Sequence, residues 1–229
     1  MKKKILITGC AGFIGSSIAK SLILKKYDIY GIDNLSTGNK NNVPKGVKFI
    51  KGRCEDDKIL KKIKSIKFQT IIHFAGQSSG EKSFYDPMED LNSNFYSTVK
   101  LINYAHNNRC KHFIYASSMS VYGDVSNQAV SETKKCKPIS FYGASKLASE
   151  NYINLFKKKK LNSTILRIFN VYGPGQNLNS SKHGMISIYL SQIFKNKKLI
   201  VKGSKNRSRD FIYIDDLVEA IIKALKNQQ

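Results

Sequence analysis

The segment FYGASK places Tyr142 and Lys146 four residues apart. On a helix this spacing puts the phenol and the ammonium on one face, within reach of a shared ligand. A free tyrosine has a pKa of about 10 and is a poor base at neutral pH, but a positive charge beside it stabilises the phenolate. The pair therefore indicates a base that could remove the proton of an alcohol.

The position of this pair matters more than its spacing. A chain with 12 tyrosines and 39 lysines and arginines produces such pairs by chance, and Tyr96 with Lys100 is a second one. In an open α/β sheet, ligands bind outside the carboxyl ends of the strands. Tyr142 and Lys146 follow the predicted strand end ASSMSVYG, whereas Tyr96 lies midway along an earlier predicted helix. We therefore interpret Tyr96 as a packing residue.

Ser118 lies at the same predicted strand end, ahead of the tyrosine. Its hydroxyl would donate to the substrate oxygen and help to place the substrate proton near Tyr142. Ser117 or Ser120 could take this role instead, because both belong to the same short segment.

A phosphate-binding turn is indicated by TGCAGFIG, in which Gly9, Gly12 and Gly15 stand between a predicted strand and a predicted helix. Glycines in this context allow a tight turn and a close approach of backbone to a pyrophosphate, while the helix N-terminus binds the anion. Asp33 ends the second predicted strand, where its carboxylate would bind a ribose diol and repel a 2′-phosphate. The sequence therefore predicts NAD, rather than NADP, as the cofactor.

Short β-branched runs alternate with helical patterns along most of the chain, which predicts an α/β fold with a doubly wound, Rossmann-type parallel sheet. The predicted strands cover residues 4–7, 28–32, 47–50, 70–73, 112–116 and 164–168. The predicted helices between them cover residues 13–25, 57–65, 88–107 and 142–158.

Two domains are expected. Residues 1–169 would form the NAD-binding Rossmann domain, and the Gly-, Pro-, Asn- and Ser-rich stretch that follows would be a loop leaving the sheet. Residues 170–229 would begin a small and incomplete substrate-binding region. Within it we predict a helix at 185–194, a strand at 199–203, and a strand followed by a helix in 209–229 that packs back on the Rossmann domain.

The composition excludes several other classes of protein. The net charge of +23 suggests a polyanionic partner, but the lysines are scattered and no nucleic-acid-binding motif appears, so only charge supports a nucleic-acid-binding protein. The four cysteines form no CxxC pair and the histidines have no ligand spacing, which predicts no metal site and fits the cytoplasm. No apolar run is long enough for a secretory signal or a membrane span.

Taken together, the motifs resemble the extended short-chain dehydrogenase/reductases of the NAD-dependent epimerase/dehydratase family that act on nucleotide sugars, and among them the UDP-glucose 4-epimerase-like members. The motifs that carry the resemblance are TGCAGFIG, DNLSTG, HFAGQSS, ASSMSVYG, YGASK, RIFNVYGPGQ and RDFIYIDD. They run through nearly the whole chain in one order, which chance would not produce.

The resemblance implies a catalytic triad of Ser118, Tyr142 and Lys146, with Tyr142 and Lys146 also contacting the cofactor. Ser118, Asn170 and Arg209 would bind the substrate, with the Arg209 guanidinium on its diphosphate. Further cofactor contacts are implied at Gly9, Gly12, Phe13, Ile14, Gly15, Asp33, Asn34, Ser36, Thr37, Gly38, Cys54, Phe74, Ala75, Gly76 and Asn94.

The activity implied by the resemblance is that of an isomerase, an NAD-dependent epimerase that inverts C4 of a UDP-linked sugar by transient hydride transfer. The related 4,6-dehydratases carry an acidic pair after the active-site serine, whereas this chain has Met119 and Ser120, which disfavours dehydration. Two alternatives stay open: another nucleotide-sugar oxidoreductase or dehydratase, and a degenerate NAD-binding module without a complete substrate site. Relatives pair through two long helices, so a homodimer is also implied.

The chain departs from the family pattern in three places. Arg53 stands where such epimerases usually have an acidic residue for the adenine amino group, so Cys54 would contribute only its backbone there. Ser78 stands where some sugar epimerases have a lysine near the phosphates. The region after residue 170 is shorter than in the family, so we expect a substrate pocket that is incomplete or completed by another subunit.

Overall fold

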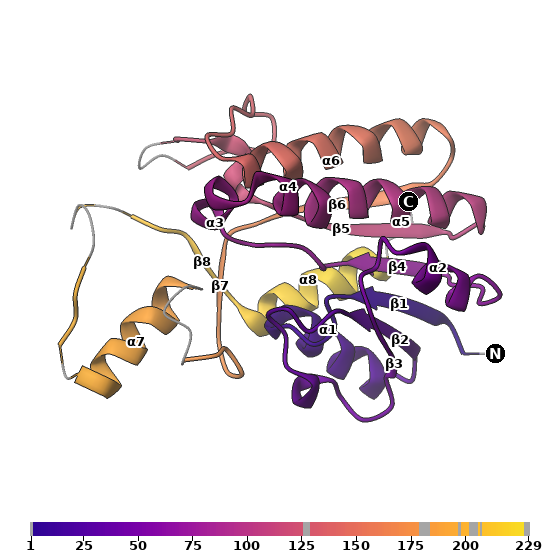
Figure 1. Ribbon diagram of the computed structural model, residues 1–229, viewed down its shortest axis with the longest axis horizontal. Coiled ribbons are helices and arrows are strands. Elements are labelled where there is room, and N and C mark those ends of the chain that lie inside the picture. The colour runs from indigo at the N-terminus through magenta and orange to yellow at the C-terminus, as the bar shows by residue number, and fades with distance from the viewer. Residues whose placement is uncertain are drawn as a thin grey trace.

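The computed structural model describes residues 2–125, 129–178, 184–196, 198–201, 206 and 208–226. Its centre is a six-stranded parallel sheet with the strand order β3-β2-β1-β4-β5-β6 (Figure 1). The strands are β1 (Lys4–Thr8), β2 (Asp28–Asp33), β3 (Lys48–Lys51), β4 (Thr70–His73), β5 (His112–Ser118) and β6 (Asn162–Ile168). This is the doubly wound Rossmann order, and the predicted fold class is confirmed.

Helices cover both faces of this sheet. On one face, α5 (Ser97–Asn107) and α6 (Phe141–Lys158) lie side by side, with α2 (Asp57–Ile63) beyond them (Figure 1). On the other face, α1 (Phe13–Leu24) packs against α8 (Ile214–Lys226). Two hydrophobic clusters result, one on each side of the sheet.

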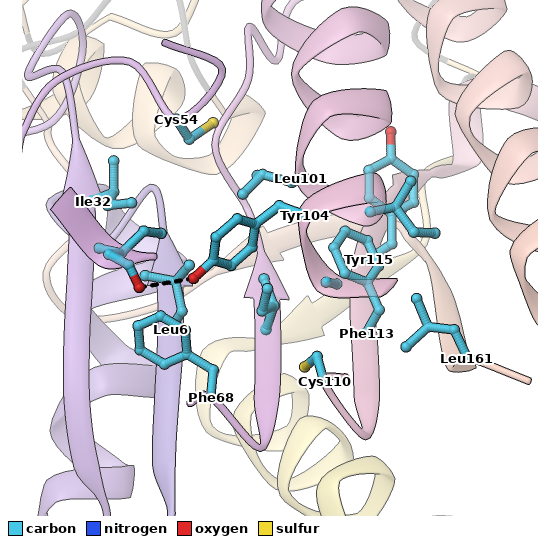
Figure 2. Packing of buried hydrophobic residues seen from close by; sticks show 14 of the residues in the cluster. Leu6, Ile32, Cys54, Phe68, Leu101, Tyr104, Cys110, Phe113, Tyr115 and Leu161 are labelled. Atoms are coloured by element: carbon cyan, nitrogen blue, oxygen red, sulfur yellow. Dashed lines mark hydrogen bonds between the residues drawn. The ribbon is translucent and has the colours of Figure 1, made fainter. Parts of the chain in front are cut away.

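Because the central strands are buried on both faces, they are almost continuous apolar runs. Ile5, Leu6 and Ile7 of β1 are at most 1% exposed and contribute to different clusters. Figure 2 shows the cluster below α2, α5 and α6, where the Tyr104 hydroxyl donates to the Ile63 carbonyl oxygen at 2.9 Å. This bond ties α5 to the end of α2 and so holds these two helices of the layer together.

The long helix predicted over 88–107 consists of three segments. A helical turn, α4 (Pro87–Asp90), begins behind the capping side chain of Asp86, a π-helical segment (Leu91–Tyr96) follows, and α5 completes the run. A π-helical turn inserts an extra residue into the helical repeat, which periodicity of apolar residues does not reveal. The short helix α3 (Gly80–Tyr85), which we did not predict, precedes this run.

Tyr96, which we interpreted as a packing residue, lies at the end of the π-helical segment. Its side chain is 46% exposed, and the Lys100 ammonium lies 6.0 Å from its ring centre. The ring is therefore only partly packed.

Beyond the sheet, a single residue, Phe169, separates β6 from the short strand β7 (Asn170–Tyr172). β7 pairs in parallel with β8 (Phe211–Tyr213), and α7 (Met185–Asn196) lies between them in the chain. We expected a loop where β7 is found, because a three-residue strand whose partner lies far along the sequence leaves no local signal. The strand predicted at 199–203 is not present over residues 199–201, and 202 and 203 lie outside the described residues.

The helix α8 directly follows β8 and places an apolar face, including Leu217 and Ile221, in the cluster beneath β1 and β5. Residues 214–226 therefore belong physically to the Rossmann layer. In the described part of the chain, no helix is long and apolar enough to cross a membrane.

Candidate active site

The first turn of α6 lies against the end of β5. Ser140 caps this helix, because its hydroxyl oxygen accepts a hydrogen bond from the Gly143 amide at 3.1 Å. A Cβ atom on Gly143 would lie 2.6 Å from the Ser120 carbonyl oxygen, so only glycine permits this approach to the 3₁₀ turn Met119–Tyr122. The close contact brings Tyr142, the second residue of α6, to the carboxyl end of the sheet.

The three predicted catalytic side chains meet there, each at most 8% exposed. The Tyr142 phenol interacts with the Ser118 side chain. The Lys146 ammonium donates to the Ala116 carbonyl oxygen at 2.9 Å and lies 5.8 Å from the centre of the Tyr142 ring. The Ser118 hydroxyl donates to the Ser120 hydroxyl at 3.2 Å, so this donor can turn towards a ligand without breaking a backbone contact.

Burial dominates the electrostatics of these groups. It lowers the pKa of Lys146 to about 8, and the negative charge of Asp90 opposes this effect. Burial raises the pKa of Tyr142, which the hydrogen bond with Ser118 counteracts and the Asp90 charge reinforces. The protein alone therefore holds Tyr142 as a neutral phenol at pH 7, and further positive charge is required to make it a base.

The turn after β1 forms a cradle for an anion. Gly9 has φ +73°, and a Cβ atom there would lie 2.8 Å from the Ala75 amide nitrogen, while one on Gly15 would lie 2.1 Å from the Gly9 carbonyl oxygen. Within the described chain, no side chain caps the N-terminus of α1, which follows Gly12. The first amides of this helix, including those of Phe13 and Ile14, are thus available to phosphate oxygens.

Asp33 stands beside this cradle at the end of β2. Its carboxylate, 7% exposed, accepts hydrogen bonds from the amides of Ala11 at 2.9 Å and Leu35 at 2.8 Å. Each oxygen retains a second lone pair, which a ribose hydroxyl could use. The predicted cofactor residues that follow form one loop packed on the turn, where a Cβ on Gly38 would lie 2.9 Å from the Ala11 carbonyl carbon. The other members of that loop are Asn34, Ser36 and Thr37.

The end of β4 forms the opposite wall. Phe74 and Ala75 touch the Gly9 turn, and Gly76 approaches Asn94 so closely that a Cβ atom would lie 2.4 Å from the Asn94 side-chain oxygen. The Asn94 amide donates to the Gln77 carbonyl oxygen at 3.0 Å. Its buried Oδ1 has no hydrogen-bond partner among the described residues, which fits a donor from a bound ligand.

Our sequence analysis did not identify two residues that complete this wall, Asp90 and Gln77. Asp90 is fully buried, and its Oδ1 accepts hydrogen bonds from the side chains of Gln77 at 2.9 Å and Asn94 at 3.0 Å. Burial raises the pKa of Asp90, and bonds with Ser145, Gln77 and Asn94 oppose that rise. The spacing of Asp90 four residues before Asn94 was the available signal.

Arg53 does not extend freely into the region beside Asp33. Its guanidinium pairs with Glu55 through Nε at 2.5 Å and with Glu89 of α4 through Nη1 at 3.1 Å. Cys54 is buried, and burial raises the pKa of its thiol. The Cys54 side chain therefore offers no thiolate at neutral pH, which leaves its backbone as the group for a ligand contact.

Of the two predicted substrate residues outside the triad, Asn170 lies near it. Its side-chain amide donates to the Asp210 carbonyl oxygen at 2.8 Å and approaches the Met119 sulfur at 3.7 Å, and Met119 directly follows Ser118. Arg209 is exposed, and its Nη1 donates to the Ser208 carbonyl oxygen at 2.9 Å. Pairing of β7 with β8 therefore brings these two residues to one edge, although they are far apart in the sequence.

Together these features could hold a long anionic ligand with a reactive group at one end. The glycine turn and the α1 amides face one end, Asp33 lies beside them, and Asn94 and the catalytic triad lie along β4 and β5. Among the described residues, no group of three or more His, Cys, Asp or Glu side chains could hold a metal ion.

Comparison with known proteins shows which family this chain resembles. A family model described as NAD dependent epimerase/dehydratase family matches residues 5–229. A putative UDP-glucose 4-epimerase from Methanocaldococcus jannaschii is 36% identical over 96% of this chain and 73% of that protein.

Two solved structures have the same fold. The crystal structure of UDP-glucose 4-epimerase from Thermotoga maritima with UDP-glucose has a TM-score of 0.93 and 31% identity, covering 97% of this chain and 73% of that one. The UDP-glucose 4-epimerase of Thermus thermophilus, a complex with NAD, has a TM-score of 0.87 and 31% identity, covering 97% and 74% of the two chains.

Replacing Asp33 with asparagine is expected to weaken NAD binding by about tenfold or more while NADP binding changes less, because the amide replaces one of the two acceptor oxygens with a donor and removes the charge that repels a 2′-phosphate. Equilibrium dialysis against each dinucleotide measures this. Asp28→Asn, at the other end of β2, is the matched control and should bind like the wild type. Equal losses for both dinucleotides would contradict the assignment.

The buried ammonium predicts a pH-dependent stability. Because the folded pKa of Lys146 is about 8 and the ordinary pKa of a lysine is 10.5, the unfolded chain binds more protons between these pH values. The unfolding free energy of the wild type should therefore rise relative to Lys146→Met, by on the order of 2 kcal/mol from pH 7 to 9.5. Urea titrations test this, with the exposed Lys20→Met as control. A difference that does not change with pH would refute it.

Proposed function

The chain belongs to the NAD-dependent epimerase/dehydratase family, and we propose that it inverts C4 of a UDP-linked sugar, as an isomerase that uses NAD. The observation that carries this proposal is the buried meeting of Ser118, Tyr142 and Lys146 at the end of β5, at the same edge of the parallel sheet as the glycine turn after β1. An alcohol bound at this end of β5 would meet a hydrogen-bond donor in Ser118, a potential base in Tyr142 and a cation in Lys146.

The residues present fit the dinucleotide. The cradle at Gly9 and Gly15 leaves no room for a Cβ atom, the α1 amides lack a side-chain cap in the described chain, and the buried Asn94 oxygen lacks a donor there. When bound, NAD supplies a reversible hydride acceptor and a positive charge near the triad. Asp33 would hold its adenosine ribose, and the backbone of residues 74–76 would lie along it.

The chain's own groups handle the proton. Ser118 would donate to the oxygen at C4, which polarises the hydroxyl and aligns it with the Tyr142 phenol. Tyr142, as phenolate beside the Lys146 ammonium, would take that proton as the hydride leaves the same carbon. After the sugar turns over, Tyr142 would return the proton to oxygen while the hydride returns to the opposite face. Protons and electrons balance, and no group of the protein is consumed.

Met119 and Ser120 favour epimerisation over dehydration. Elimination of water from the sugar needs an acid and a base besides the tyrosine, and neither a thioether nor a serine hydroxyl supplies them at neutral pH. The Met119 sulfur is instead in contact with the Asn170 amide, and the Ser120 hydroxyl is a partner of Ser118.

We assign substrate binding to the region that starts at residue 170. Asn170 lies near Met119 and would contact the nucleotide sugar, and Arg209, on the segment leading into β8, would bind its diphosphate through the guanidinium. In this division, residues 1–169 bind NAD and residues 170–229 begin the substrate-binding region, with α8 packed back on the NAD-binding layer. The cytoplasm is the proposed compartment, since all four cysteines are free thiols.

Tyr142→Phe is expected to lower kcat for epimerisation by about a thousandfold, because it removes the only atom that takes the proton. The measurement is the conversion of UDP-glucose, and separately of UDP-N-acetylglucosamine, to the C4 epimer by NMR with NAD present. Tyr152→Phe, on the same helix and 43% exposed, is the matched control and should retain activity. Tight NAD binding by a wild type that converts no nucleotide sugar would favour a non-catalytic NAD-binding module.

We also propose a homodimer that pairs through the layer of α5 and α6. Large apolar side chains are exposed on α6 and on the elements that precede α5, and the rings of Phe84 and Phe141 lie 5.5 Å apart. The exposed members are Phe84, Tyr85, Met88, Leu91, Phe141, Tyr152 and Leu155. Exposed apolar patches often mark protein interfaces.

Leu155→Glu should convert the dimer to a monomer, because it introduces a charge into the apolar contact. Light scattering coupled to size exclusion measures the mass in solution. Leu24→Glu, which changes a leucine that is 76% exposed on the opposite helical layer, should leave the mass unchanged. A wild type that is monomeric at micromolar concentration would exclude the proposed dimer.

A further inference from the structure

Glu150 lies one helical turn beyond Lys146 and carries a buried carboxylate that the proposed reaction does not use. Its side chain is 4% exposed. Oε1 accepts a hydrogen bond from the Ser117 hydroxyl at 2.5 Å, and the Arg167 guanidinium donates through Nε to Oε1 at 3.0 Å and through Nη2 to Oε2 at 2.7 Å. Both oxygens are thus engaged, and a planar fork sets the direction of the carboxylate.

Arg167 also contacts segments of the chain other than α6. It lies on β6 directly beside Ser117 of β5 in the parallel register. Its guanidinium carbon lies 4.8 Å from the ring centre of Tyr122, in the turn after Ser118, and its Nη1 donates to the Glu132 carbonyl oxygen at 3.0 Å. One side chain therefore contacts α6, the 3₁₀ turn and the segment that leads to the N-terminus of α6.

Three contacts join one face of α6 to β5. Tyr142, Lys146 and Glu150 are four residues apart on that face. Their partners on β5 are three successive residues: Ser118 interacts with the phenol, the Ala116 carbonyl oxygen accepts from the ammonium, and the Ser117 hydroxyl donates to the carboxylate. Rotation or sliding of α6 would disturb all three contacts together, and Glu150 also binds Arg167 of β6.

Stability is a poor explanation for such a pair. Burying two charges costs solvation energy that their attraction only partly recovers, and apolar replacements of similar size are often as stable. A site that must hold hydroxyl groups in line, however, gains from a rigid and directional contact, since small displacements greatly slow a reaction.

We propose that the Glu150–Arg167 pair is a positioning device for the epimerase reaction, which locks α6 against β5 and β6 so that Tyr142 and Ser118 face the same substrate oxygen. This inference rests on the proposed function. Neither residue touches the reacting atoms, so both act through the placement of Tyr142, Lys146 and Ser118.

The test replaces both charges at once, in Glu150→Leu/Arg167→Met. This variant removes the directional contact without leaving a lone buried charge, so we expect it to fold with a melting temperature near that of the wild type. We expect kcat for UDP-sugar epimerisation to fall by about 30- to 100-fold, with KM and the NAD dissociation constant within about threefold. Asp57→Asn/Lys100→Met, which removes the exposed ion pair between α2 and α5, is the matched control and should keep the wild-type kcat.

Wild-type kcat in a stable double variant would overturn the proposal, because the pair would then serve stability alone. If the double variant does not fold, Glu150→Gln and Arg167→Lys replace it. A lower kcat with unchanged KM in these two supports positioning, and unchanged kcat in both overturns it.

A wild type without epimerase activity would instead contradict the proposed function. Hydrogen exchange of the folded double variant would then test the role of the Glu150–Arg167 pair directly. We expect the amides of residues 142–146 to exchange at least about tenfold faster than in the wild type, with those of α1 unchanged. Equal exchange at both places would overturn the positioning role.

Discussion

The ammonium of Lys146 donates to the Ala116 carbonyl oxygen within the carboxyl end of β5, almost out of contact with water. This bond holds a positive charge close to the Tyr142 ring, and it anchors the catalytic helix to the sheet at the same point. The charge is costly to bury, as the lowered pKa of Lys146 shows, and the nearby carboxylate of Asp90 relieves only part of that cost. The fold thus accepts a local loss of stability at the place where chemistry needs a cation.

Much of the fold and part of the site could be predicted because their signals are local. Each central strand is a short apolar run, and Gly9, Gly15 and Asp33 stand at the ends of such runs, where topology alone fixes their location. The same argument distinguished the Tyr142–Lys146 pair, which follows a strand end, from the Tyr96–Lys100 pair, which does not. The parallel sheet followed from the alternation of elements, since parallel strands need crossover helices.

What escaped prediction depends on contacts between distant parts of the chain. The pairing of β7 with β8 joins segments about 40 residues apart, and Arg167 meets Glu150 from a different strand. Asp90 and Gln77 are both partners of Asn94, which lies in the π-helical segment. The four-residue spacing of Asp90 and Asn94 is visible in the sequence, but the other contacts are set by packing rather than by neighbours along the chain.

The single residue between β6 and β7 has a consequence for how a substrate would be presented. One residue spans at most about 3.6 Å, so the first residue of β7 must lie close to the end of β6. The place of Asn170 beside Met119 is therefore tied to the end of the main sheet. Evolution could exchange the segments beyond this strand, and so change the sugar that is accepted, without realigning the reactive end of the pocket.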